Sequence, residues 1–215
     1  MHPVGAPILI TAAMAVFGKS VGAVRLLGLV AVTATCTNLY AMARLLKLPG
    51  IVGLGMGVLY LGMTNRFNGL ATNTEILFAP FVTGAIALAL RAAMAAVDDR
   101  VVPPWGTLVG MGLLVGVALT IKPVAIPEGC FAFAVLILPA WRHGAISILR
   151  ALGMAIAYAV LCLVPTLVLA ACYAAIGAFD IFWNAVFAAP FRYAGGRLPA
   201  EEAAWLISAS ALFLL

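Results

Sequence analysis

Long apolar runs constrain the fold of this chain more than any other feature of its sequence. The longest run, residues 151–177, contains no charged side chain, and about 20 consecutive apolar residues suffice for an α-helix to cross a bilayer. The runs do not alternate apolar and polar residues, as the strands of an outer-membrane barrel do. We therefore expect helices, in which each segment satisfies its own backbone hydrogen bonds in lipid.

The rest of the sequence fits the same class. Hydrophobic residues make up 66% of the 215 residues and charged residues only 9%, which excludes a soluble globular domain. The sequence predicts an all-α polytopic membrane protein, with one transmembrane domain over residues 1–215 and no nucleic-acid partner. The six expected spans are residues 26–43, 50–63, 76–96, 105–121, 124–140 and 151–177. A juxtamembrane helix over residues 4–17 is expected before them and part of a seventh span, residues 203–215, after them.

Glycine and proline refine these expectations. The span over residues 105–121 carries four glycines, which favours close approach of a neighbouring helix. Pro165 lacks an amide hydrogen, so a bend is expected in the last complete span. Residues 178–202 are expected to be amphipathic and loop-like.

Charged residues gather at the ends of the spans. Short loops make neighbouring spans antiparallel, so alternate loops lie on the same side of the membrane. The basic residues of the first side are Arg44, Lys47, Arg91, Arg100, Arg142 and Arg150; those of the second are Lys19, Arg25, Arg66, Lys122, Arg192 and Arg197. These equal numbers leave the orientation unassigned by the positive-inside rule.

The carboxylates are distributed less evenly. The first side has Asp98 and Asp99, whereas the second has Glu75, Glu128, Asp180, Glu201 and Glu202. Because both signs of charge meet helix ends on the second side, its basic residues are candidates for binding an anionic group. Alternatively, they extend to lipid headgroups without a further role.

Glu75 follows a polar turn and begins an apolar segment. Ionisable groups near the bilayer interior are expensive and tend to mark function. A structural interpretation is equally open, because Asn73 or Thr74 is a good helix N-cap and the helix dipole favours a carboxylate in the first turn.

Four segments, in this order and spacing, carry a resemblance to a known family. They are residues 2–44, residues 72–75, residues 112–123 with the string GLLVGVALTIKP, and more weakly residues 183–193. Together they resemble the membrane-embedded GT-C glycosyltransferases, specifically the dolichyl-phosphate-mannose protein mannosyltransferase-like and aminoarabinose transferase-like families.

The resemblance implies an inverting transfer of a sugar from a polyprenyl phosphate to an unknown acceptor on the extracytoplasmic face of a bacterial inner membrane. Lys122 is then the leading contact for the donor phosphate, and Arg66, Arg192 and His2 are secondary candidates. Glu75 is implied as a carboxylate that positions the acceptor or supports a divalent metal ion; with one acid and no paired ligand, no metal-ligand set is assigned. Asp180 is implied as a contribution from a later loop, or is a helix N-cap.

Two departures from the family pattern matter. The family's first helix and its catalytic acidic loop would lie upstream of Met1, and the family's Lys-Pro-Pro string stands here as His2, Pro3 and Val4. We therefore expect a fragment that has no transferase activity on its own. A membrane transporter or a structural membrane subunit are the alternative functions.

Overall fold

A computed structural model describes residues 4–66, 72–99 and 102–188 of the chain. All regular structure in these residues is helical, which confirms the predicted all-α class. The helices are α1 (Gly5–Phe17), α2 (Val21–Leu45), α3 (Gly50–Arg66), α4 (Thr74–Asp99), α5 (Trp105–Ile121), α6 (Ile126–Arg142), α7 (Ile148–Ala175) and α8 (Phe179–Trp183). A 3₁₀ turn, Pro123–Ala125, precedes α6, and a π-helical turn, Asn184–Ala188, follows α8.

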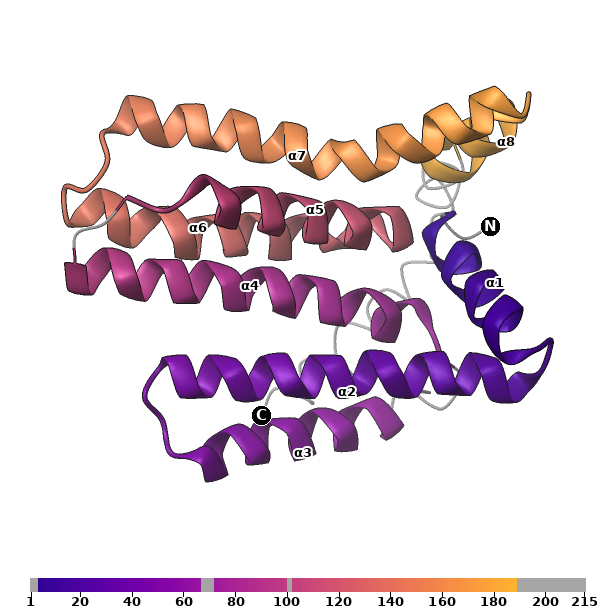
Figure 1. Cartoon of the computed structure of the whole chain (residues 1–215), viewed down its shortest axis with the longest axis horizontal. Helices are drawn as coiled ribbons and strands as arrows, with labels where there is room; N and C mark the ends of the chain where they lie inside the picture. The colour runs from indigo at the N-terminus through magenta and orange to yellow at the C-terminus, as the bar shows by residue number, and fades with distance from the viewer. Residues whose placement is uncertain (1–3, 67–71, 100–101, 189–215) are drawn as a thin grey trace, which may run out of the picture.

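Helices α2 to α7 lie side by side and alternate in direction, while α1 crosses one end of this bundle at a steep angle (Figure 1). Four segments are long and apolar enough to cross a membrane: Val21–Leu45, Thr74–Val97, Pro123–Arg142 and Ile148–Ala175. Helices α3 and α5 have 17 residues each and are apolar, at the short end of the range of about 17–25 residues for a span. The polytopic architecture is thus confirmed.

The alternating directions separate two ends of the bundle (Figure 1). We call them the Glu75 end, where α1, the start of α4, the end of α5 and α8 lie, and the Arg44 end, where α2 turns into α3. The structure therefore places the described charged residues on the two sides that the loop lengths predicted.

Short polar caps and glycines set the helix limits. The N-cap residues of α2, α4 and α7 are Ser20, Asn73 and Ser147. The side chain of each accepts a hydrogen bond from the backbone N–H three residues later, at 3.2–3.3 Å. Gly144 and Gly177, with φ of 73° and 70°, end α6 and α7 in a conformation that glycine adopts without strain.

Small residues bring the central helices together. Ala85, Ala89 and Ala96 of α4 are fully buried, and Leu108 and Met111 of α5 belong to the same core cluster. In the absence of a hydrophobic driving force between helices in lipid, such small faces allow the close packing that stabilises a membrane bundle.

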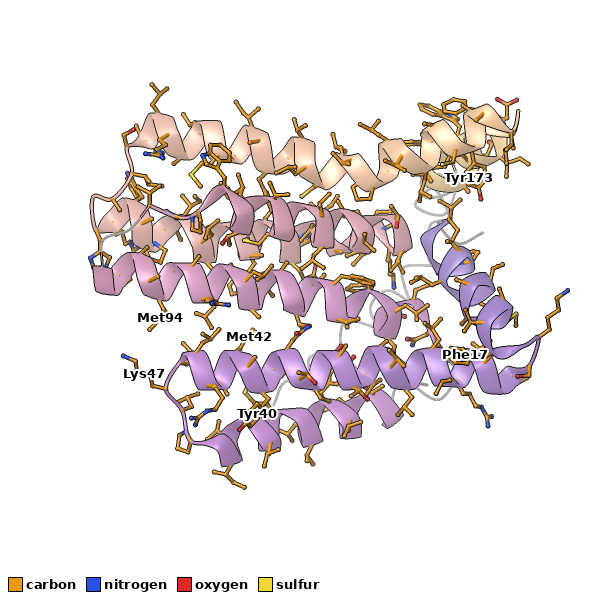
Figure 2. The ribbon with its side chains drawn as sticks, in the orientation of Figure 1. Phe17, Tyr40, Met42, Lys47, Met94 and Tyr173 are labelled. Carbon is orange, nitrogen blue, oxygen red and sulfur yellow. The ribbon has the colours of Figure 1, made fainter. Side chains whose placement is uncertain are left out.

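The segment expected to be a loop, residues 178–202, begins instead as α8 and its π-helical turn. For residues 179–188 that expectation was wrong, because Phe182 and Ala185 recur at helical spacing and are both buried, whereas residues 189–202 lie outside the described part of the chain. Phe182 is 1% exposed, and its ring centroid lies 5.7 Å from that of Tyr173 at the end of α7 (Figure 2). The expected partial seventh span, residues 203–215, lies outside the described residues.

Helix α7 continues through Pro165, and Figure 1 shows its course change direction along its length, in line with the predicted bend.

A side-chain amide joins α2 to α4. Asn38 Nδ2 donates to the carbonyl oxygen of Pro80 at 2.9 Å and to Thr83 Oγ1 at 3.0 Å.

We expect Asn38→Leu to lower the free energy of unfolding by about 1 kcal/mol, since hydrogen bonds between membrane helices contribute roughly 0.6–2 kcal/mol. Denaturation in mixed micelles measures this. Thr37→Val is the control, because Thr37 Oγ1 bonds only within α2; an equal loss in both variants would contradict the prediction.

Candidate functional site

The Glu75 end of the bundle contains an ion pair between residues far apart in the sequence. Lys122 Nζ donates a hydrogen bond to Glu75 Oε1. Among the side chains that the structure describes, this is the only ion pair. The lysine side chain is 30% exposed and that of the glutamate 54%, so both remain accessible from outside the bundle. The two residues that the sequence singled out first are therefore in direct contact.

The turn before α4 holds Glu75 in place. Thr72 has a φ of 51°, and its Oγ1 donates to a backbone carbonyl of α2 at 3.2 Å. It packs against Gly28, where an added Cβ would lie 2.6 Å from Thr72 Oγ1, so only glycine fits. Asn73 is the N-cap, and Thr74 Oγ1 donates to Glu75 Oε2 at 3.3 Å. The cap and the charged contact thus coexist: Asn73 satisfies the helix end, which leaves the carboxylate for Lys122.

Lys122 lies at a break between two helices. Its backbone is extended, with φ of −154° and ψ of 115°, because Pro123 follows and starts a 3₁₀ turn. Its N–H donates to the carbonyl of Ala118 at 2.8 Å, and its carbonyl accepts from Ala125 at 3.1 Å. These bonds hold the backbone of Lys122 between α5 and α6, so only its side chain is free to reach a neighbour.

Helix α1 closes over the end of α5. A Cβ added to Gly5 would lie 2.6 Å from Thr120 Oγ1 and 2.7 Å from its carbonyl carbon. The contact brings the start of α1 within two residues of Lys122. Sequence reasoning missed it, because nothing in the local pattern of a short apolar helix indicates which distant residue it will touch.

The other predicted site residues are less fully placed. Arg66 is the last residue of α3, whose end lies at the Glu75 end, and its side chain is outside the described part of the structure; His2 and Arg192 lie wholly outside it. Asp180 is exposed in the first turn of α8 and pairs with no described cation. It is not an N-cap, since α8 begins at Phe179 and Ala178 occupies the cap position.

The described residues at the Glu75 end contain no preformed cluster of metal-binding side chains. Within residues 4–66, 72–99 and 102–188, no group of three or more His, Cys, Asp or Glu side chains lies close enough to hold an ion. A divalent ion beside Glu75 stays a prediction.

Glu128, in the first turn of α6, is a further acid at this end. Its Oε2 is buried and has no hydrogen-bond partner among the described residues, which is rare for a carboxylate oxygen. The sequence had placed Glu128 on this side, but its local pattern resembles ordinary helix initiation, with Pro127 before it.

One of three comparisons with known proteins identifies a family for this chain. The sequence profile of the dolichyl-phosphate-mannose-protein mannosyltransferase family matches residues 1–169, which include α1 to α6 and most of α7. No curated protein and no solved structure gives a significant match to the chain.

Proposed function

Because the chain belongs to the dolichyl-phosphate-mannose-protein mannosyltransferase family, we propose that it binds a polyprenyl-phosphate sugar and serves its transfer to an acceptor. Family membership establishes a multi-pass membrane protein of the GT-C glycosyltransferase type; the donor, the acceptor side and the residue roles are our proposal. In it, the Glu75 end faces the extracytoplasmic side of a bacterial inner membrane. The ion pair between Lys122 and Glu75 is the observation that carries the assignment.

The reaction needs a cation where the donor phosphate lies. When the sugar leaves, negative charge develops on the lipid phosphate, and a positioned ammonium group stabilises it. Lys122 suits this role because its backbone is held at both sides while its side chain stays accessible. A lysine ammonium has three donors, so it can bind phosphate oxygens as a point charge.

Glu75 gives the lysine a partner that can be exchanged. Exposed ion pairs contribute only about 0–1 kcal/mol, so an anionic phosphate can displace the carboxylate at small cost. Once displaced, the Glu75 carboxylate is available to position the acceptor hydroxyl or a divalent ion. Arg66, Arg192 and His2 remain secondary candidates for the phosphate, and Asp180 for the acceptor.

Donor binding tests this proposal. The chain, in detergent, is titrated with a fluorescent polyprenyl-phosphate mannose, with the corresponding polyprenol and a sugar nucleotide as controls. We expect the phosphate lipid to bind at least about 10-fold more tightly than the polyprenol, as a charge-assisted hydrogen bond contributes roughly 1.5–3 kcal/mol. We expect the nucleotide not to compete. Equal binding of lipid phosphate and polyprenol would contradict the proposed donor.

A further inference from the structure

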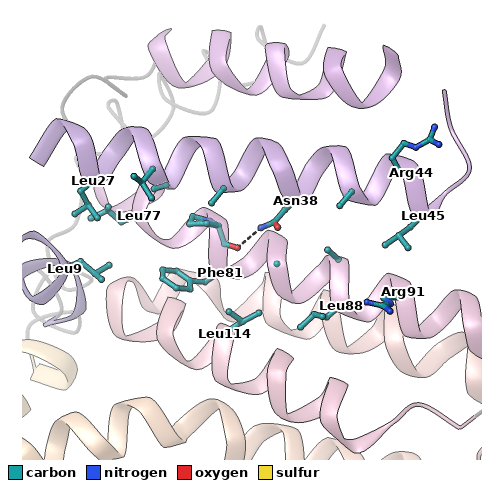
Figure 3. A pocket seen from close by; sticks show the side chains of 17 residues that line it. Leu9, Leu27, Asn38, Arg44, Leu45, Leu77, Phe81, Leu88, Arg91 and Leu114 are labelled. Atoms are coloured by element: carbon teal, nitrogen blue, oxygen red, sulfur yellow. Dashed lines mark hydrogen bonds between the residues drawn. The ribbon is translucent and has the colours of Figure 1, made fainter. Parts of the chain in front are cut away.

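A long groove runs along the bundle, away from the ion pair. It has a volume of about 910 Å³ and lies between α2 and α4, with contributions from α1 and α5 (Figure 3). At one end Leu9 of α1 and Leu77 of α4 line it, and Phe81 and Leu88 continue the apolar wall. Neither Glu75 nor Lys122 lines it. The groove is therefore a separate feature of the molecule.

Two arginines stand at the other end of the groove. Arg44 is in the last turn of α2 and Arg91 is in the second half of α4, and both contribute to the lining at the Arg44 end. In Figure 3 the Arg44 side chain extends toward the turn after α2 and away from Arg91. Both are exposed, and neither pairs with a carboxylate among the described side chains. Arg44 Nη1 donates to the carbonyl of Leu48 at 3.3 Å, which occupies one of its five N–H donors.

We infer that this groove binds an anionic glycerophospholipid, with its acyl chains along the apolar wall and its phosphate against Arg44 and Arg91. Planar guanidinium groups bind phosphate oxygens in pairs, and basic residues at a membrane surface attract anionic lipids. The inference is independent of the donor proposed above, whose phosphate belongs to the opposite end of the bundle.

The size and polarity of the groove favour a lipid over a protein segment. A spanning helix is about 10 Å across and 30 Å long, which is more than twice the volume of the groove. A helix brings an anion to the two arginines only where it carries an acidic side chain at that end, whereas an anionic phospholipid always carries its phosphate at the headgroup. A phospholipid satisfies both the apolar wall and the charged end.

Native mass spectrometry of the full chain in detergent tests the inference. Dioleoyl phosphatidylglycerol and dioleoyl phosphatidylcholine are added separately, and the affinity of each is measured. We expect phosphatidylglycerol to bind about 10-fold more tightly, and the double variant Arg44→Gln, Arg91→Gln to lose this preference with a roughly 10- to 30-fold weaker affinity. Glycerol phosphate, which has the anion without the chains, should not displace the lipid at equal concentration.

Two further variants keep the test specific. Lys47 lies in the turn after α2, points away from the helices and does not line the groove (Figure 2), so Lys47→Gln should leave the preference unchanged. Ala41 lines the groove and is exposed, so Ala41→Phe narrows the groove without entering the core and should weaken both lipids.

Four results would overturn the inference. The first is equal binding of the two lipids, and the second is that Lys47→Gln loses the preference for phosphatidylglycerol as fully as the double arginine variant. The third is displacement of phosphatidylglycerol by a polyprenyl phosphate whose binding also requires Arg44 and Arg91. The fourth is lipid binding that occurs only after residues 189–215 are removed. The third result would assign the groove to the sugar donor, and the fourth to the chain's own C-terminal segment. Helix content by circular dichroism confirms that each variant is folded.

Discussion

Gly116→Val is expected to prevent α5 and α7 from packing. A Cβ at this position would lie 2.6 Å from the carbonyl oxygen of Cys162 and 2.7 Å from Cδ of Pro165. The first is a backbone atom and the second belongs to a rigid ring, so neither can move aside as a flexible side chain would. Overpacking costs about 1–3 kcal/mol where side chains can adjust. Here we expect a loss of at least about 3 kcal/mol in the free energy of unfolding, measured in mixed micelles.

Gly106→Val is the matched control. It lies in the same helix, and nothing stands within 4 Å of a Cβ added there. Both variants replace glycine with valine, so a difference between their free energies of unfolding reports the contact of α5 with α7. Equal stability of the two variants would mean that α5 and α7 do not approach as closely as the structure shows.

Lys122→Met and Glu75→Gln are expected to change donor binding in opposite directions. Removing the ammonium takes away the charge-assisted contact with phosphate, which weakens binding of a polyprenyl-phosphate sugar by roughly 10- to 100-fold. Removing the carboxylate frees Lys122 from its competitor, so Glu75→Gln should tighten donor binding by about 2- to 5-fold. The double variant should bind the donor as weakly as Lys122→Met does. Titration with the fluorescent donor gives all three values.

Lys19→Met controls for the general loss of positive charge at this end of the bundle. Lys19 is exposed in the turn between α1 and α2 and has no ion-pair partner among the described residues. We expect less than about a 5-fold effect, since an exposed charge near a membrane contributes roughly 1 kcal/mol or less. If Glu75→Gln weakened donor binding as much as Lys122→Met does, the donor phosphate would not replace the Glu75 carboxylate on Lys122. That result would favour an ion pair with a purely structural role.

The order of apolar runs and short loops along the sequence already predicted most of the fold. Apolar runs located α2 to α7, and the short loops between them indicated their antiparallel order. Glu75 and Lys122 could be assigned to one end on the same basis. Their contact could not, because the position of one helix end relative to another depends on packing, such as that of Thr72 against Gly28.

The remaining features show where local patterns fail. The aromatic spacing that forms α8 was present in the sequence, but the composition of residues 178–202 resembled a loop and outweighed it. The groove between α2 and α4 depends on side chains from four helices, and Arg44 and Arg91 are 47 positions apart in the sequence. Such a cavity has no signature in any single segment.

The close approach of α5 and α7 also implies an order of events during biosynthesis. Helix α5 precedes α7 in the chain and leaves the ribosome first, so the face that carries Gly112 and Gly116 initially lacks its partner helix. Lipid tails cannot match the shape of Leu161 and Pro165, and α5 has only 17 residues with which to hold its position. The packing of α5 against α4 can therefore form first, and the face of α5 that carries the two glycines is covered only after α7 has been inserted.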